Sequence, residues 1–388
     1  MRIIRKWGIH YIEASADVEA DPLYCGADYI RHWTHEVGTT ARRYGITISS
    51  LYTGHGTYYT LGLAHNNEAV RRRIQEEWLK PMINSAADLG ANFGFFCHAI
   101  PQTILHDPLK YRKTCKDLME CLAYLAVYAK EQKLRKLAIE QMYTPNQPPW
   151  TINGAWEMIR KVFTALNAPL YITIDTGHAN AQRRYLEPKV RHIAAVLRSY
   201  REEKKLGTVW LGPKAAYDII EEAAETREAI PDLVRELRPK IREQVARHPW
   251  LFAKEEDGDI YRWLEELGPF SPIIHLQQND GRSSQHLPFT PENNMVGIIE
   301  PRRLLNSLAK KYLRPPERDL PPICEDVFLT LEIFPTTAQR PREILDMMQR
   351  SVEYWRKFIP EDGVPLDQLV EPKEEPIEEI RHPGWMLP

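Results

Sequence analysis

The chain has 388 residues, enough for one large domain or two ordinary ones with a substantial buried core. Its 51 basic and 53 acidic residues leave a formal net charge of -2, which gives no general electrostatic affinity for nucleic acid. Five cysteines without a Cys-x-x-Cys pair argue against a disulfide framework or a structural zinc site. Because no run of about eighteen apolar residues occurs, we expect a soluble cytoplasmic protein that binds neither nucleic acid nor a membrane.

Short apolar runs alternate along the chain with longer amphipathic segments, which is the pattern of parallel βαβ units. Apolar residues at i, i+3 and i+4 spacing predict helices over Asn67–Leu89 and Pro108–Gln132, whereas Ile3–Gly8 resembles the end of a helix. The predicted strands are Tyr11–Ala14, Ile46–Leu51, Asn92–Cys97, Lys136–Met142, Leu170–Ile174, Pro272–Leu276 and Val327–Ile333. A closed barrel of this kind has eight strands. We therefore expect a (β/α)8 TIM barrel whose first strand is absent, short or rearranged.

Two regions have the composition of additions to this barrel, which we expect to occupy residues 1–359. Residues 182–256 are almost wholly helical in pattern and rich in charge, so they predict a helical insertion near the barrel mouth. Its charged residues are those of a solvated helical face, or of a lid over the site. Residues 360–388 are rich in Pro and Glu and predict an extended C-terminal tail, which ends in the apolar Trp385-Met-Leu-Pro.

Four of the predicted strands end in a side chain that binds divalent metals. These segments are Leu137-Ala-Ile-Glu140, Tyr171-Ile-Thr-Ile-Asp175, Pro272-Ile-Ile-His275 and Phe328-Leu-Thr-Leu-Glu332. In a parallel barrel all these ends face the same side of the molecule, where the chemistry of such folds resides. Three carboxylates that converge there would repel one another unless a cation neutralised them. This mixed oxygen and nitrogen set predicts a site for Mn²⁺, with Mg²⁺, Co²⁺ and Zn²⁺ as alternatives.

Each of these residues also has an ordinary structural explanation. A glutamate at a strand end is often a helix cap or the partner of an arginine, and a single buried histidine is more often hydrogen-bonded than metal-bound. All four together are harder to explain in this way, because a buried and unpaired charge is expensive. The set therefore favours a metal site. Such a site leaves positions open for two substrate oxygens, so it predicts stabilisation of an enediolate while a nearby carboxylate moves the carbon-bound proton.

Three segments resemble the xylose isomerase-like TIM-barrel superfamily: Ile-Asp-Thr-Gly-His, Ile-His-Leu-Gln-Gln-x-Asp-Gly-Arg and Leu-Glu-Ile. The superfamily includes ketose 3-epimerases, inosose isomerases and dehydratases, and repair enzymes of the endonuclease IV type (AP endonuclease family 2). The resemblance covers roughly residues 9–350 outside the insertion. It implies that the metal ligands are Glu140, Asp175, His275 and Glu332. It further implies that Glu140 and Glu332 are the proton-transferring pair, and that His178 and Arg282 contact substrate oxygens.

Two further histidines lie near predicted strand ends, His55 and His98, and in sugar isomerases such residues assist ring opening or bind a hydroxyl. Aromatic residues suited to an apolar platform for a sugar are Tyr52, Tyr143, Trp150 and Phe334. The chain departs from the epimerase pattern in two places. Asn146 stands where epimerases usually carry a second glutamate, and about a hundred residues separate Asp175 from His275.

We therefore expect a divalent-metal-dependent isomerase or epimerase that acts on a ketose or keto-polyol. An alternative is a lyase or dehydratase of a keto-sugar or 3-keto-glycoside, which would use the same site with a leaving group β to the carbanion. An endonuclease IV-like hydrolase is less favoured, because it needs more metal ligands and a cationic groove. A barrel without catalytic activity would bind no metal tightly. Barrels of this kind often form dimers or tetramers, so we expect a homo-oligomer.

Overall fold

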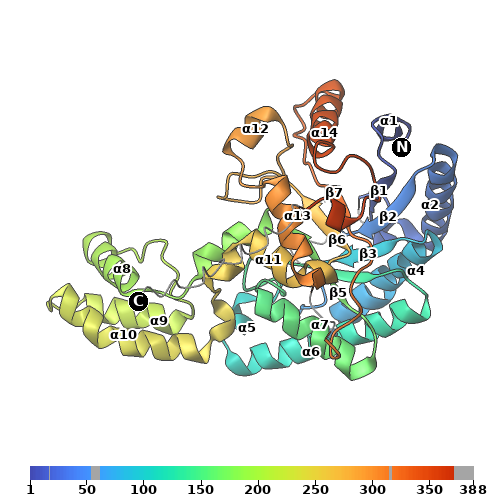
Figure 1. Cartoon of the computed structure of the whole chain (residues 1–388). Helices are drawn as coiled ribbons and strands as arrows, with labels where there is room; N and C mark the ends of the chain where they lie inside the picture. The colour runs from blue at the N-terminus through green and yellow to red at the C-terminus, as the bar shows by residue number, and fades with distance from the viewer. Residues whose placement is uncertain (17, 54–61, 314–316, 371–388) are drawn as a thin grey trace, which may run out of the picture.

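The computed structural model describes residues 1–16, 18–53, 62–313 and 317–370. Seven strands form one parallel sheet whose order follows the chain (Figure 1). They are β1 (Tyr11–Ser15), β2 (Thr47–Tyr52), β3 (Asn92–Phe95), β4 (Leu137–Glu140), β5 (Tyr171–Asp175), β6 (Ile273–Leu276) and β7 (Phe328–Leu331). Each overlaps one of the seven predicted strands. The described residues thus supply seven of the eight strands of a complete (β/α)8 barrel.

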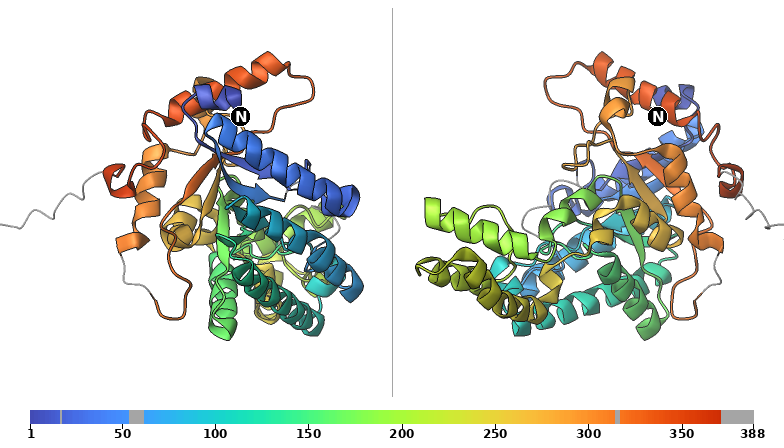
Figure 2. Two further views of the ribbon diagram at one scale, coloured as in Figure 1. Left: turned by 90° about the vertical axis from the view of Figure 1, so that its right-hand side faces the viewer. Right: turned by 60° about the vertical axis from the view of Figure 1, so that its left-hand side comes forward.

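Helices and short 3-10 or π turns (η) connect the strands. In chain order they are α1 (Arg2–Lys6), α2 (Pro22–Tyr44), α3 (Glu68–Arg73), η2 (Ile74–Leu79), α4 (Lys80–Asp88), α5 (Gln102–Leu105), α6 (Pro108–Glu131), α7 (Ile152–Leu166), η3 (His178–Tyr185), α8 (Val190–Glu203), α9 (Lys214–Ala224), α10 (Ile230–Arg247), η4 (Pro249–Leu251), η5 (Glu255–Gly258), α11 (Ile260–Leu267), η6 (Gly268–Phe270), α12 (Pro291–Val296), α13 (Pro301–Ala309), η7 (Lys311–Leu313), α14 (Pro341–Trp355) and η8 (Leu366–Gln368). The outer layer runs through α2, α4, α6, α7, α11 and α13, each of which packs against the next (Figure 2).

Local sequence explains where these elements begin and end. The side chain of Asp107 accepts hydrogen bonds from the backbone N–H groups of Leu109 and Lys110, and Pro108 takes the first helical position, so α6 begins where the sequence predicts. Gly45 adopts a left-handed conformation with φ 62°, which ends α2 immediately before β2. The central strands are buried along their whole length, as expected for a parallel sheet covered by helices on one face and closed around its own core on the other.

The barrel is nearly closed at the seam between its first and last strands. The rings of Tyr11 on β1 and Phe328 on β7 lie 5.2 Å apart, centroid to centroid. A register shift between Ile12 and Glu13 interrupts the pairing of β1 with β2. Such a bulge bends a strand and redirects its side chains. Glu13 reaches across the barrel interior, where its Oε1 lies 3.1 Å from Nε2 of His275 on β6.

The long connection between β5 and β6 is largely helical. Helices α8, α9 and α10 pack against one another and form an arm beside the barrel (Figure 1). Apolar residues at helical spacing line the inner face of α10, namely Leu233, Leu237, Ile241 and Val245, while most of its charged residues face solvent. The indole of Trp210 donates to the Leu251 carbonyl at 2.9 Å, which joins the loop before α9 to η4. The assignment of residues 182–256 as a separate insertion in the barrel remains a prediction.

The C-terminal segment begins as part of the fold. Leu366, Leu369 and Val370 are partly buried against the hydrophobic core, and η8 packs on α13. Asp362 accepts a hydrogen bond from the backbone N–H of His10 at 2.9 Å and pairs with Arg356, so residues near both ends of the chain are tied together. Trp385 and the rest of 371–388 lie outside the described residues. Among the described helices, none has both the length and the apolar character needed to cross a membrane.

Candidate metal centre

The four predicted ligands converge at the carboxyl ends of neighbouring strands. Glu140 and Asp175 are the last residues of β4 and β5, His275 lies one residue before the end of β6, and Glu332 follows β7 directly. Glu140, Asp175 and His275 are buried, with side-chain exposures of 2%, 0% and 1%, and Glu332 is 23% exposed. The parallel strands bring these side chains to one side of the barrel, as expected from their positions in the sequence.

Their potential ligand atoms lie close enough to share one cation. Nδ1 of His275 is 3.5 Å from Oε1 of Glu140 and 3.5 Å from Oε2 of Glu332. One potential ligand atom from each of Asp175, His275 and Glu332 lies within 4.8 Å of the other two, and the same holds for Glu140, Asp175 and His178. Asp175 belongs to both groups. The cluster therefore surrounds a space of the size that a divalent ion occupies.

Several of these buried atoms lack a well-aligned hydrogen bond within the described residues: Oε2 of Glu140, Oε2 of Glu332 and both ring nitrogens of His275. Buried polar atoms of native proteins are almost always paired, and an unpaired buried charge costs several kcal/mol. A divalent cation bonded to the carboxylate oxygens and to one nitrogen of His275 removes most of that cost. The donor set accordingly fits a divalent metal.

Neighbouring groups hold Asp175 in place. The side-chain nitrogen of Gln277 lies 2.8 Å and 3.0 Å from the two carboxylate oxygens of Asp175 and donates to them. The backbone N–H of Gly177 donates to Oδ1 at 2.6 Å. The side-chain oxygen Oε1 of Gln277 in turn accepts a hydrogen bond from the backbone N–H of His286 at 2.8 Å. Such partners orient metal ligands and fix their geometry before the metal binds.

The charges of the cluster shift its ionisation equilibria. Burial, together with the nearby carboxylates of Asp175 and Glu140, raises the pKa of Glu332 well above its usual range, although His275 opposes this. Burial also acts to raise the pKa of Asp175, but electrostatic interactions with the imidazoles of His178, His286 and His275 outweigh it, so the pKa is lowered. The cluster is therefore built to hold positive charge among its carboxylates.

His178 lies beside this cluster. Its Nδ1 is 2.7 Å from the carbonyl oxygen of Gln141, which only accepts, so Nδ1 carries the proton. Nε2 is left with a lone pair, 3.7 Å from Oδ2 of Asp175. Tyr143 packs on the ring of His178, with centroids 4.9 Å apart. His178 can thus offer a nitrogen either to a substrate hydroxyl or to a cation.

Two acidic or basic residues of the site were not singled out from the sequence. Glu13 lies inside the predicted strand Tyr11–Ala14, and the one signal in the sequence is an acidic residue at a strand position. His286 belongs to the loop after β6, and its Nδ1 lies 3.5 Å from Oε2 of Glu332. Its ring stacks on Phe334 with centroids 3.9 Å apart. Burial lowers the pKa of His286 to about 4, so its imidazole is neutral at physiological pH.

The structure places the other predicted site residues farther from the cluster. His98 is buried, and Phe96 lies between it and Tyr52, with ring centroids 5.2 Å and 6.1 Å away. Tyr52 in turn packs edge-on against His275 at 4.4 Å. The side chain of Arg282 is 88% exposed and lies 3.8 Å from Asp280. His55 falls within 54–61 and lies outside the described residues.

Asn146, which stands where epimerases usually carry a second glutamate, holds the loop after β4. Its side-chain nitrogen donates to the Ile100 carbonyl at 2.8 Å, and the Ile100 N–H donates to the Asn146 carbonyl at 2.7 Å. These two bonds fasten this loop to the segment after β3. The amide of Asn146 therefore has a structural use in this chain.

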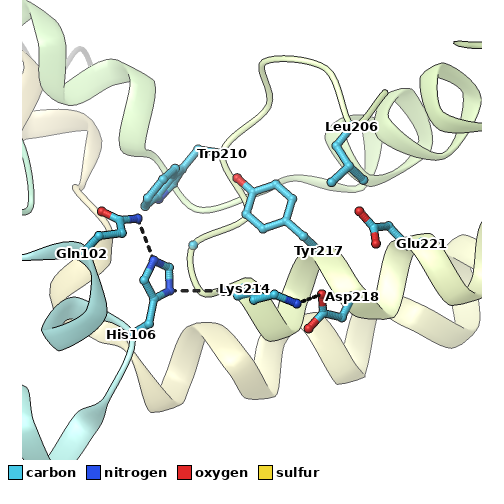
Figure 3. Close-up of a pocket in the computed structure, with 9 residues that line it drawn as sticks. Gln102, His106, Leu206, Trp210, Lys214, Tyr217, Asp218 and Glu221 are labelled. Carbon is cyan, nitrogen blue, oxygen red and sulfur yellow. Dashed lines mark hydrogen bonds and ion pairs between the residues drawn. The ribbon is translucent and has the colours of Figure 1, made fainter. Parts of the chain in front are cut away.

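A pocket of about 410 Å³ lies elsewhere, between α5 and the arm (Figure 3). His106 bridges its two walls: its ring nitrogens lie 2.7 Å from the side chain of Gln102 and 3.1 Å from the backbone N–H of Lys214. The Lys214 ammonium binds Asp218 at 2.5 Å. Gln102, His106, Lys214 and Asp218 are therefore already paired with one another.

Comparisons with known proteins agree with the barrel fold. A stretch of 107 residues is 29% identical to the D-erythrulose 1-phosphate 3-epimerase of Brucella abortus (strain 2308), covering 28% of this chain and 31% of that enzyme. The chain thus spans about a third of the length of this relative. A protein of Rhodospirillum rubrum ATCC 11170 that is assigned to the xylose isomerases has a similar fold, with a TM-score of 0.63, 17% identity and coverage of 92% of this chain and 91% of that one. A D-psicose 3-epimerase determined with D-fructose superimposes with a TM-score of 0.50 at 11% identity, covering 92% and 91% of the two chains. The family described as xylose isomerase-like TIM barrel matches residues 1–209, more than half of the sequence, and the chain belongs to that family.

Proposed function

We propose that this protein is a divalent-metal-dependent sugar epimerase or isomerase that acts on a ketose. One observation carries the proposal: Glu140 and Glu332, on different strands, both lie 3.5 Å from the same nitrogen of His275. Two carboxylates placed so that they can share a cation with a histidine provide the groups that proton transfer next to a carbonyl needs. The family and the epimerase relative support the same function.

The proposed metal ligands are Glu140, Asp175, His275 and Glu332. Carboxylate and imidazole ligands suit Mn²⁺, which is our first choice, and also Co²⁺, Mg²⁺ or Zn²⁺. A bound cation supplies positive charge beside the substrate carbonyl and hydroxyl oxygens, which stabilises the negative charge that develops when the carbon-bound proton leaves.

Glu140 and Glu332 are the proposed proton-transferring pair. Burial and neighbouring carboxylates raise the pKa of Glu332, a change that suits a group which delivers a proton near neutral pH. Glu140 first removes the carbon-bound proton from one face of the substrate, and Glu332 then delivers a proton to the opposite face. His178, with its free Nε2 lone pair, accepts a hydrogen bond from a substrate hydroxyl, and the Tyr143 ring that packs on it offers an apolar surface. Arg282 has no role in this proposal, because its side chain faces solvent.

The relative in Brucella abortus suggests where a search for the substrate begins. Its name specifies a four-carbon ketose phosphate, so we propose short ketoses and their 1-phosphates as the first substrate panel. The reaction is followed in D₂O by NMR with Mn²⁺ present. We expect exchange of the carbon-bound proton for deuterium and an epimeric or isomeric product. Release of water or of an aglycone would contradict the proposal in favour of a lyase.

Two substitutions test the site itself. Glu140→Gln and Glu332→Gln keep the size of the side chains but remove the charge, so both should lower metal content and reduce turnover by at least about a hundredfold. Glu36→Gln on the exposed face of α2 is the matched control and should behave as the wild type. The proposal fails if both site variants keep full metal content and turnover. A dimer or tetramer, the expected assembly, is checked separately by light scattering on the same samples.

A further inference from the structure

Glu13 is a partly buried carboxylate that the proposed reaction does not use, and its position is well defined. Its side chain is 14% exposed and reaches the metal centre from β1, on the opposite side of His275 from Glu140 and Glu332. Oε1 of Glu13 lies 3.1 Å from Nε2 of His275, a hydrogen-bond length, although the N–H is not well aligned with that oxygen. The two nitrogens of His275 therefore face different carboxylates.

Two features of the fold hold Glu13 there. The register shift between Ile12 and Glu13 redirects the strand at this residue. The hydroxyl of Ser50, a fully buried residue on β2, donates to Oε2 of Glu13 at 2.6 Å. Oε1 is left to face the imidazole. The carboxylate is thus held in one orientation, with one oxygen on Ser50 and the other toward His275.

We propose that Glu13 is a positioning residue for the metal ligand His275: it accepts the Nε2–H of the imidazole and so leaves the Nδ1 lone pair for the cation. A histidine ligand usually donates its second N–H to a carboxylate, carbonyl or water, and that hydrogen bond selects which nitrogen binds the metal. In this chain Nδ1 faces Glu140 and Glu332, whereas Nε2 faces Glu13. The edge of Tyr52, 4.4 Å from the ring of His275, restricts rotation out of this orientation. This inference rests on the proposed metal site.

The first test compares substitutions at Glu13 by titration calorimetry with Mn²⁺ and Zn²⁺. Glu13→Ala removes the acceptor, so the dissociation constant should rise about 10- to 100-fold. Glu13→Gln keeps an oxygen that accepts the N–H, and it should recover most of the affinity. An equal loss in both variants would overturn the proposal, because it would mean that Glu13 binds the metal directly. Wild-type affinity in Glu13→Ala would overturn it as well.

Two neighbouring serines provide a matched pair of variants. Ser50→Ala removes the bond that holds Glu13, so metal affinity should fall several-fold. Ser49→Ala removes a buried hydroxyl that donates to the Ile12 carbonyl and should leave affinity unchanged. Equal affinities in the two variants would contradict the assigned role of Ser50 in placing Glu13.

A spectroscopic measurement on the wild-type protein makes the test independent of whether the variants fold. In protein loaded with Zn²⁺ and labelled with ¹⁵N-histidine, NMR should show His275 bound through Nδ1 with a proton on Nε2. Coordination through Nε2 would overturn the inference. The inference and the proposed function can fail separately. If the wild type binds no metal, or if Asp175→Asn binds it as tightly as the wild type, the proposed site is wrong. If Asp175→Asn loses metal affinity but the Glu13 variants bind metal as tightly as the wild type, the proposed metal site is retained and the inference about Glu13 is wrong.

Discussion

The side-chain amide of Gln277 donates to both carboxylate oxygens of Asp175, at 2.8 Å and 3.0 Å, and both residues are fully buried. This contact connects β5 to the segment after β6, two parts of the chain separated by the arm. Gly177 leaves no room for a side chain there, because a Cβ on it would lie 2.3 Å from the Gln277 amide. The orientation of Asp175 therefore depends on a residue about a hundred positions later in the sequence.

Loss of the Gln277 amide should weaken metal binding. Gln277→Met keeps the approximate shape of the side chain but removes both hydrogen bonds to Asp175, so we expect a 10- to 100-fold increase in the Mn²⁺ dissociation constant. Calorimetric titration measures it. Gln278→Met is the control: Gln278 is also buried, but it bonds to Asn294 and the Ile299 carbonyl. The control should lose stability and keep its metal affinity, and equal affinities in the two variants would contradict the assigned role of Gln277.

Metal removal should lower the melting temperature. A ligand at a hundred times its dissociation constant stabilises the folded state by about 2.7 kcal/mol. Dialysis against EDTA should therefore reduce Tm by a few degrees, and added Mn²⁺ should restore it. Asp175→Asn, which loses one ligand charge, should respond much less. If EDTA leaves Tm unchanged in differential scanning calorimetry of metal-loaded protein, the centre holds no stabilising ion.

Stability should decrease in mild acid because of His98. Burial lowers the pKa of this imidazole from 6.5 to about 4 in the folded protein. Between these values the unfolded chain binds more protons, so the free energy of unfolding falls as pH decreases from 6.5 to 4 and levels off below. The full effect is at most roughly 3 kcal/mol, since one pKa unit corresponds to about 1.4 kcal/mol.

Urea unfolding of metal-free protein at pH 7.5, 5.5 and 4.5 measures this effect. His98→Asn should flatten the dependence, because asparagine does not titrate and tolerates the φ of 24° that His98 adopts. His32→Asn, at an exposed histidine of α2, should leave the slope as in the wild type. A slope that is unchanged in His98→Asn would show that another group is responsible.

The carboxylate of Asp257 should be important for stability rather than for chemistry. It is buried and accepts two backbone hydrogen bonds of 2.7 Å, one from Ile152 at the start of α7 and one from Lys254. Asp257→Ala leaves both donors without a partner, which should cost about 3 kcal/mol in the free energy of unfolding. Glu256→Ala, at an exposed neighbour, should cost less than about 0.5 kcal/mol. Chemical denaturation measures both, and metal affinity should be unchanged in each.

Much of the fold follows from local pattern. All seven predicted strands exist, and the helices begin at the caps that the sequence contains, such as Asp107. These features were predictable because backbone periodicity and capping depend on residues close together in the chain. Strand ends such as Glu140 and Asp175 were predictable for a related reason, since a parallel barrel brings them to one face whatever the intervening loops do.

The sequence by itself determined the alternation of strands and helices, and with it the four ligand candidates at strand ends. Only the tertiary structure decided that Glu13 and His286 join them and that Arg282 points to solvent. The closure of the barrel decides the position of Glu13: β1 and β7 meet at the seam, and a bulge turns the Glu13 side chain inward, toward His275 on β6. Loop conformation decides the positions of His286 and Arg282. It depends on contacts such as the hydrogen bond between Gln277 and His286 and not on any local periodicity. Contacts between residues far apart in the sequence leave no local pattern, so they become visible only when the chain is folded.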